Sequence, residues 1–181
     1  IQLALTWLLE LMNAEDLDVL HTCCNFWLII SRRYHHERQQ NKQQASALTE
    51  IYEPALPDAR RLIIQNMQKP DDIIIVEDQS GNVVRESKKN TNTSMIYSTM
   101  KECLMYLTSV DPNDTIEAFQ EMIDALSRQW IPDLYNRICW SVGAISRTLD
   151  FEREKSFITY LLRIQLQMSQ SQGDPNERAI I

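Results

Sequence analysis

Apolar residues recur at helical spacing along most of this chain, and short polar turns separate one periodic segment from the next. The chain has 181 residues with only 3 Gly and 6 Pro, and 44% of its residues are apolar, a balance that suits long helices around a continuous core. The predicted buried stripes are Leu17, Leu20, Cys24 and Trp27; Ile96, Met100, Cys103, Leu107 and Val110; Ile116, Phe119, Ile123, Leu126 and Trp130; and Leu134, Ile138, Val142, Ile145 and Leu149. The sequence therefore predicts an all-α fold.

Residues that begin helices stand at the breaks between these segments. Asn13 is a candidate N-cap with Asp16 three residues on, and Asp114 is a candidate N-cap with Glu117 three residues on. Pro132 suits the first turn of another helix, because its missing N–H costs nothing there. The sequence thus predicts a series of helices joined by short turns.

The helices recur in pairs about every 40 residues, which is typical of HEAT-type repeats. Several of them are apolar on two faces, as a helix with neighbours on both sides needs to be. We therefore expect an α-α superhelix, a HEAT-repeat solenoid of about three and a half helix pairs over residues 1–181, which is one fragment of a longer chain. A compact helical bundle is the alternative.

One segment, residues 71–92, breaks the helical pattern and predicts an inserted β-hairpin. Ile73–Val76 and the pair Val83 and Val84 are β-branched, and Gly81 lies in the polar stretch between them, where it can adopt the left-handed conformation of a tight loop. A lone hairpin is marginal in water, so we expect it to lie against other structure. Composition leaves two interpretations open, a loop packed on its own solenoid and an arm that docks on a partner.

Composition and motifs exclude several classes of function. The net charge of −7 and the pI near 5.0 argue against direct DNA binding, and no apolar run approaches the ~20 residues of a membrane span. No acid–base pair, nucleophile motif or phosphate-binding glycine loop accompanies the three histidines, which we expect to be exposed or half-buried. The four cysteines lack metal-ligand spacing and are expected to be buried thiols. We expect no enzyme activity, no cofactor, no metal and no membrane insertion.

Five stretches together resemble the exportin-1 family of nuclear export receptors, part of the importin-β/karyopherin superfamily. They are IIIVEDQSGNVVRE, MIYSTMKECLMYLTSVD, ICWSVGAIS, EKSF and ERAII, in the family's order and spacing. The resemblance covers about residues 60–181, is weaker over 1–34, and has no clear counterpart for 38–49. It implies a ring of HEAT repeats, with this chain as a central fragment.

The resemblance assigns the hairpin the role of the family's acidic loop, which contacts Ran carrying GTP and otherwise lies behind the cargo groove. Ile75, Val76, Val83 and Val84 match its strands, and Glu77, Asp78 and Glu86 match its acidic positions. Residues 90–93, Asn-Thr-Asn-Thr, stand where the family usually has more acid, which weakens the expected electrostatic share of the contact.

The resemblance also implies that the helix from about 150 to 172 is one wall of a groove for leucine-rich export signals. Leu162, Leu166 and Ser169 match groove-lining positions, and Arg178 matches a basic position at the groove edge. Their spacing of i, i+4 and i+7 independently places the first three on one helical face. Ser169 stands where the family often has a cysteine that reacts with leptomycin-type inhibitors.

The expected partners are therefore Ran-GTP, cargo proteins with leucine-rich export signals, and nucleoporins, with shuttling between nucleus and cytoplasm. Two other hypotheses remain. One is a HEAT-repeat scaffold without control by Ran, and the other is a metal-dependent hydrolase.

Overall fold

The computed structural model describes residues 2–40, 51–69, 72–77, 83–88, 91–129 and 131–148, together with Lys155 and Thr159. By their contacts, residues 1–148 form one compact unit and residues 149–181 a second. All further elements named below belong to the first unit.

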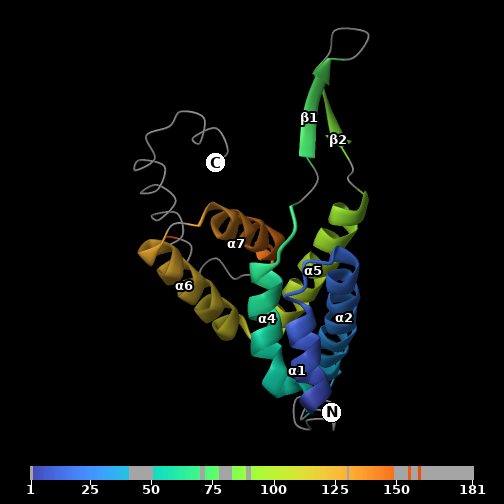
Figure 1. Ribbon diagram of the computed structural model, residues 1–181, viewed down its shortest axis with the longest axis vertical. Coiled ribbons are helices and arrows are strands. Elements are labelled where there is room, and N and C mark those ends of the chain that lie inside the picture. The colour runs from blue at the N-terminus through green and yellow to red at the C-terminus, as the bar shows by residue number, and fades with distance from the viewer. Residues whose placement is uncertain are drawn as a thin grey trace. The chain divides into compact units, whose positions relative to one another are not determined.

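The described part of the first unit is helical apart from one pair of strands (Figure 1). Its helices are α1 (Gln2–Leu11), α2 (Leu17–Gln40), the 3-10 turn η1 (Glu53–Ala55), α4 (Leu56–Gln65), α5 (Thr91–Val110), α6 (Pro112–Arg128) and α7 (Pro132–Ile145). Its strands are β1 (Asp72–Glu77) and β2 (Val83–Lys88). The prediction of a helical chain is confirmed, and both strands lie within the range 71–92 predicted for a hairpin.

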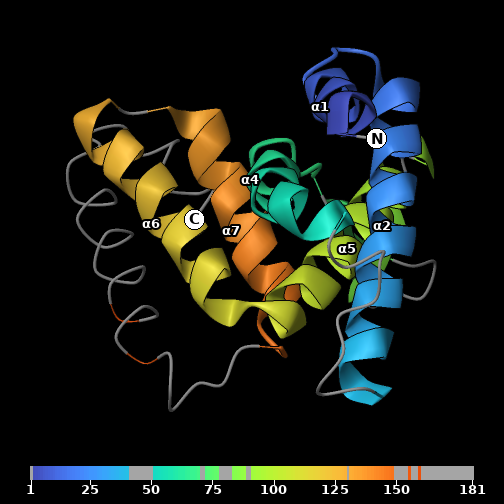
Figure 2. The ribbon, with the colours of Figure 1, turned by 90° about the horizontal axis from the view of Figure 1, so that it is seen from below.

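Consecutive helices pack in pairs, α1 with α2, α4 with α5, and α6 with α7. The α2–α5 packing is also extensive, and the two helices lie side by side in Figures 1 and 2. This arrangement is compatible with the predicted repeats of two helices each.

The centre of the α2–α5 interface is a fully buried cluster. Trp27 and Cys24 of α2 have no exposed surface, and neither do Met100 and Cys103 of α5. The buried Ser31 hydroxyl lies 3.5 Å from the Cys103 sulfur. The apolar spacing read from the sequence therefore identifies the interface on both helices.

A second cluster forms where α4, α6 and α7 meet α5. It contains Ile63 and Ile64 of α4, Phe119, Ile123 and Leu126 of α6, and Ile138 and Ile145 of α7, all of which are buried. The predicted stripes are right in their centres and less so at their ends. Leu17 is 41% exposed, because it begins α2, where the helix has no neighbouring turn to cover it.

Two helix starts differ from the prediction. Asp16, and not Asn13, caps α2, since its Oδ1 accepts hydrogen bonds from the N–H groups of Asp18 and Val19 at 2.8 and 3.3 Å. Asp111, and not Asp114, caps α6, since its Oδ1 accepts from the Asp114 N–H at 3.0 Å. In α6 the helix begins directly after the cap, at Pro112, whose fixed φ favours the first helical position. Pro132 lies in the first turn of α7, as predicted.

Candidate functional site

The predicted regulatory hairpin is an antiparallel pair of strands between α4 and α5. The backbone register places Val76 opposite Val84, Glu77 opposite Val83, and Ile75 opposite Arg85. Ile75, Val76, Glu77, Val83, Val84 and Glu86 therefore all lie in strands. Asp78 lies outside the described residues.

The register separates the acidic positions of this ribbon. Glu86 is opposite Ile74, which puts it on the same face as the Val76–Val84 pair, whereas Glu77 and Val83 belong to the other face. Each face thus combines one acidic position with β-branched ones.

The two helices that flank the hairpin are joined by a buried arginine. Arg60 of α4 is 1% exposed, and its Nη2 donates to the backbone carbonyl of Leu107 in α5 at 3.0 Å. Its Nη1 forms an ion pair with Asp114 Oδ2 in the first turn of α6. Burial lowers the pKa of Arg60 to about 10, which still leaves the side chain charged at neutral pH. One side chain therefore connects three helices.

Arg61, the next residue, extends the same network to the surface. Its Nη1 donates to the other oxygen of Asp114 at 3.2 Å, and its Nε and Nη2 form a two-point contact with Glu121 at 2.8 and 3.1 Å. The hydrogen bond to Glu121 raises the pKa of Arg61 and, in return, lowers the pKa of Glu121. Asp114 is thus shared by two arginines, one buried and one partly exposed.

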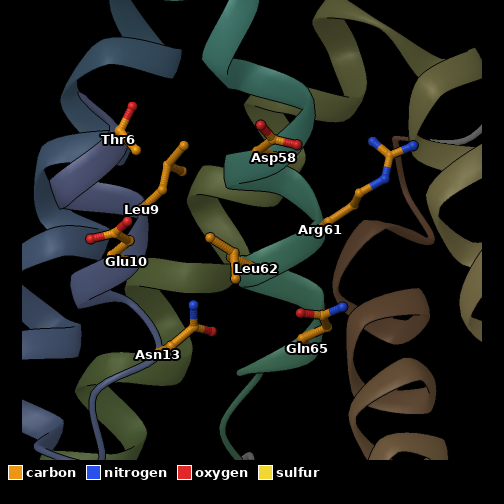
Figure 3. A pocket seen from close by; sticks show the side chains of 8 residues that line it. All are labelled: Thr6, Leu9, Glu10, Asn13, Asp58, Arg61, Leu62 and Gln65. Atoms are coloured by element: carbon orange, nitrogen blue, oxygen red, sulfur yellow. The ribbon is translucent and has the colours of Figure 1, made fainter. Parts of the chain in front are cut away.

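A pocket of about 310 Å³ lies between α1 and α4 (Figure 3). Leu9 and Leu62 form its apolar part, and Arg61 extends away from α1, toward the carboxylates of α6. The remaining lining residues are polar: Thr6, Glu10, Asn13, Asp58 and Gln65. This pocket was not predicted from the sequence. Its lining residues do share helical faces in the sequence, but spacing does not tell which two helices are neighbours.

The predicted groove residues Leu162, Leu166, Ser169 and Arg178 lie outside the described residues, so the groove stays a prediction. Earlier in the same sequence segment, Lys155 and Thr159 are helical and exposed, and the Thr159 hydroxyl donates to the Lys155 carbonyl at 2.7 Å.

The polar chemistry of the described residues offers no metal centre. Within those ranges, no three side chains of the types His, Cys, Asp or Glu are grouped so that they could hold a metal ion. His21 and His35 are half-buried and His36 is exposed, as predicted, and each ring lies within hydrogen-bond distance of a neutral polar side chain: Thr99, Gln39 and Gln40 respectively. No helix in the described ranges is both long enough and apolar enough to cross a membrane.

The four cysteines differ in their exposure to solvent. Cys23, Cys24 and Cys103 are buried, as predicted for cysteines in a helical core, whereas Cys139 on α7 is exposed, contrary to that prediction. Cys139 falls outside the apolar stripe of α7, next to the buried Ile138, so its helical position turns it away from the core.

Comparison with known protein families gives two matches in sequence order. The model described as CRM1/Exportin repeat 2 matches residues 48–115, and the one described as CRM1/Exportin repeat 3 matches residues 127–174. The first match contains α4, both strands and α5, and the second contains α7.

Longer proteins that are similar to this chain are also named as exportins. Exportin-1 of Drosophila melanogaster is 30% identical to this chain, in an alignment that covers 98% of this chain and 18% of the relative. Exportin-1 of Dictyostelium discoideum is 27% identical, and the alignment covers 96% of this chain and 17% of the relative. Protein EXPORTIN 1A of Arabidopsis thaliana is 25% identical, and the alignment covers 98% of this chain and 19% of the relative. The chain thus spans less than a fifth of the length of these relatives.

Proposed function

This chain belongs to the CRM1/exportin family, and from this we propose that it is the central segment of a nuclear export receptor built as a HEAT-repeat solenoid. The receptor binds leucine-rich export signals of cargo and Ran-GTP, contacts nucleoporins, and shuttles between nucleus and cytoplasm. The observation that carries this proposal is the pair of exportin repeats in order, the first of which encloses the strands.

In the proposed mechanism the hairpin couples the two ligands. The strands contact Ran-GTP through Ile75, Val76, Val83 and Val84, with Glu77, Asp78 and Glu86 as acidic contacts. The wall formed by Leu162, Leu166, Ser169 and Arg178 takes the export signal, since grooves lined by leucine suit amphipathic helical peptides. The Arg60 contacts support this role, because they hold the helices before and after the hairpin together at a fixed distance from α6.

The test is a binding measurement on the complete protein that carries this chain. Ran-GTP is expected to raise the affinity for a leucine-rich signal peptide by about 5- to 150-fold, and the peptide must raise the affinity for Ran-GTP by the same factor, because coupling between two binding sites is reciprocal. Ran-GDP is the matched control. A protein that binds partners equally with either nucleotide is the scaffold of the alternative hypothesis.

Two charge reversals locate the coupling on the hairpin. Glu77→Lys and Glu86→Lys change opposite faces of the ribbon, so the proposal expects them to reduce the Ran-dependent gain unequally. Unchanged coupling in both variants would remove the hairpin from the mechanism while leaving the export function itself intact.

A cysteine-reactive inhibitor of the Michael-acceptor type gives a further prediction. We expect no adduct at Ser169, because a hydroxyl without an activating base is too weak a nucleophile for this reaction. We expect slow labelling at Cys139 instead, since it is the exposed thiol of the described residues, although burial of its sulfur raises its pKa. Peptide mapping by mass spectrometry after mild treatment of the native chain distinguishes the sites. A stable adduct at Ser169 would refute the prediction, and a Cys139→Ser variant is the control.

A further inference from the structure

A second pocket, of about 380 Å³, lies on α2 beside α5 and is lined by cationic, imidazole and apolar groups. Its lining residues are Ile29, Arg32, Arg33, His35, His36 and Tyr106. No carboxylate lines this pocket, although the chain as a whole carries a net charge of −7. The two lining side chains that carry a full charge, Arg32 and Arg33, are therefore both cationic.

Helical geometry gathers these groups on one exposed surface. Ile29, Arg33 and His36 follow the spacing i, i+4 and i+7, and Arg32 falls between them, so all four share the face of α2 opposite its buried stripe. Ile29 is 65% exposed, so its apolar side chain is accessible beside the cationic groups. An apolar contact and several cationic contacts are thus available to the same ligand.

Tyr106 of α5 closes one side of the pocket. Its ring centre lies 5.8 Å from the guanidinium carbon of Arg32 and 5.3 Å from the ring centre of His35. A guanidinium over an aromatic face is held in place by attraction to the ring. The pocket therefore has one ordered wall formed by both helices.

Two acidic side chains lie next to the pocket and already contact its arginines. Arg32 Nη2 donates to Glu102 at 2.5 Å, and Arg33 Nε donates to Glu37 at 3.2 Å. Both arginines are more than half exposed, and exposed pairs of this kind contribute only about 0–1 kcal/mol. Each guanidinium also has five N–H donors in a planar fork, so an added carboxylate can be bound without first breaking either pair.

We propose that this pocket binds an acidic peptide segment of a partner protein. Carboxylates of the segment contact Arg32, Arg33 and His36, and an adjacent apolar side chain packs between Ile29 and Tyr106. Nucleic acid fits less well, because it requires a longer run of cations along the backbone than this single pocket supplies. A free small anion would leave the apolar contacts unused.

The test uses the 181-residue chain and a fluorescently labelled peptide of alternating Asp and Glu around one Phe. The Arg33→Glu variant is expected to weaken binding at least about tenfold, equivalent to ~1.4 kcal/mol. Arg147→Glu is the matched control, since it makes the same charge change at an exposed position after α7 and should leave the affinity within about twofold. Ile29→Ser, which alters no charge, should weaken binding severalfold through the lost apolar contact.

Competition separates the possible ligands. An Asp and Glu peptide without Phe should compete more weakly than the labelled peptide, and inorganic phosphate should compete only through ionic strength. Equal weakening by Arg33→Glu and Arg147→Glu would overturn the proposal, because binding would then follow net charge alone. Tighter binding of a single-stranded oligonucleotide of the same charge would also overturn it, in favour of nucleic acid. None of these outcomes depends on Ran or on an export signal.

Discussion

The Asp114→Ala variant is expected to lose about 3 kcal/mol of unfolding free energy, because removing one partner of a buried ion pair leaves the other charge buried without its ion-pair contact. Arg60 is 1% exposed, and the Asp114 side chain is only 18% exposed, so solvent can do little to replace the lost carboxylate. The change also removes the contact from Arg61 Nη1 to Asp114 Oδ1. Urea unfolding followed by circular dichroism measures the loss.

Glu121→Ala is the matched control for this prediction. Glu121 contacts Arg61 through two hydrogen bonds, but its side chain is 53% exposed, so its removal should cost less than about 1 kcal/mol. An equal loss in the two variants would contradict the assignment of Asp114 as the partner of a buried charge.

A substitution of the other partner, Arg60, tests the same ion pair. Arg60→Met keeps an unbranched side chain in the core and leaves Asp114 with Arg61 as a partner, so its cost should be clearly smaller than that of Asp114→Ala. The Leu107 carbonyl that Arg60 releases still accepts from the Asp111 N–H at 3.0 Å. A larger loss in Arg60→Met than in Asp114→Ala would show that the arginine contributes mainly through its hydrogen bond to the Leu107 carbonyl and not through its pairing with Asp114.

The sequence predicted the burial of core residues but did not predict this ion pair. The periodic spacing of Trp27 and Cys24, or of Met100 and Cys103, depends only on residues within one helix, and it predicted their burial correctly. The contact of Arg60 with Asp114 joins residues far apart in sequence, and nothing local distinguishes Asp114 from an N-cap.

The same limit applies to the candidate sites. The β-branched run and the polar loop predicted a hairpin within residues 71–92, where the strands 72–77 and 83–88 lie, because strand propensity and turn chemistry are local. The register, which puts Glu77 and Glu86 on opposite faces, depends on how the two strands align. The pockets beside α1 and α2 depend on which helices become neighbours, so the sequence predicted neither pocket. Asn13 was interpreted as a candidate N-cap, and His35 and His36 as exposed or half-buried groups.

The buried thiols predict a strong loss of stability at alkaline pH. Burial raises the pKa of Cys103 from 9.0 to about 12 and also raises that of Cys24, which lies in the same α2–α5 core. In the unfolded chain both thiols ionise near pH 9, while in the folded chain they stay protonated. Above pH 9 the unfolded state therefore binds fewer protons than the native state, and the free energy of unfolding falls as the pH rises.

The expected loss is about 1.4 kcal/mol per thiol at pH 10, one unit above the unfolded pKa, and hence ~3 kcal/mol for the two thiols together. The stability is fully present below pH 9. The free energy of unfolding should be measured between pH 8 and 10. Above pH 10 the native state loses the Arg60 proton before the unfolded state does, because burial lowers the pKa of Arg60, and this raises the free energy of unfolding with pH. Urea unfolding at several pH values, with a reductant present, gives the slope.

Cys103→Ser identifies the source of this slope. Serine has nearly the same shape, can hydrogen-bond to the Ser31 hydroxyl that now lies 3.5 Å from the sulfur, and does not ionise in this range. The variant should therefore lose about 1.4 kcal/mol less than the parent chain at pH 10, whatever its absolute stability. Because the thiols lie between α2 and α5, the slope reports on the helix that directly follows the hairpin. A slope identical to that of the parent chain would mean that Cys103 gains solvent in the native state, and the dry α2–α5 core would have to be abandoned.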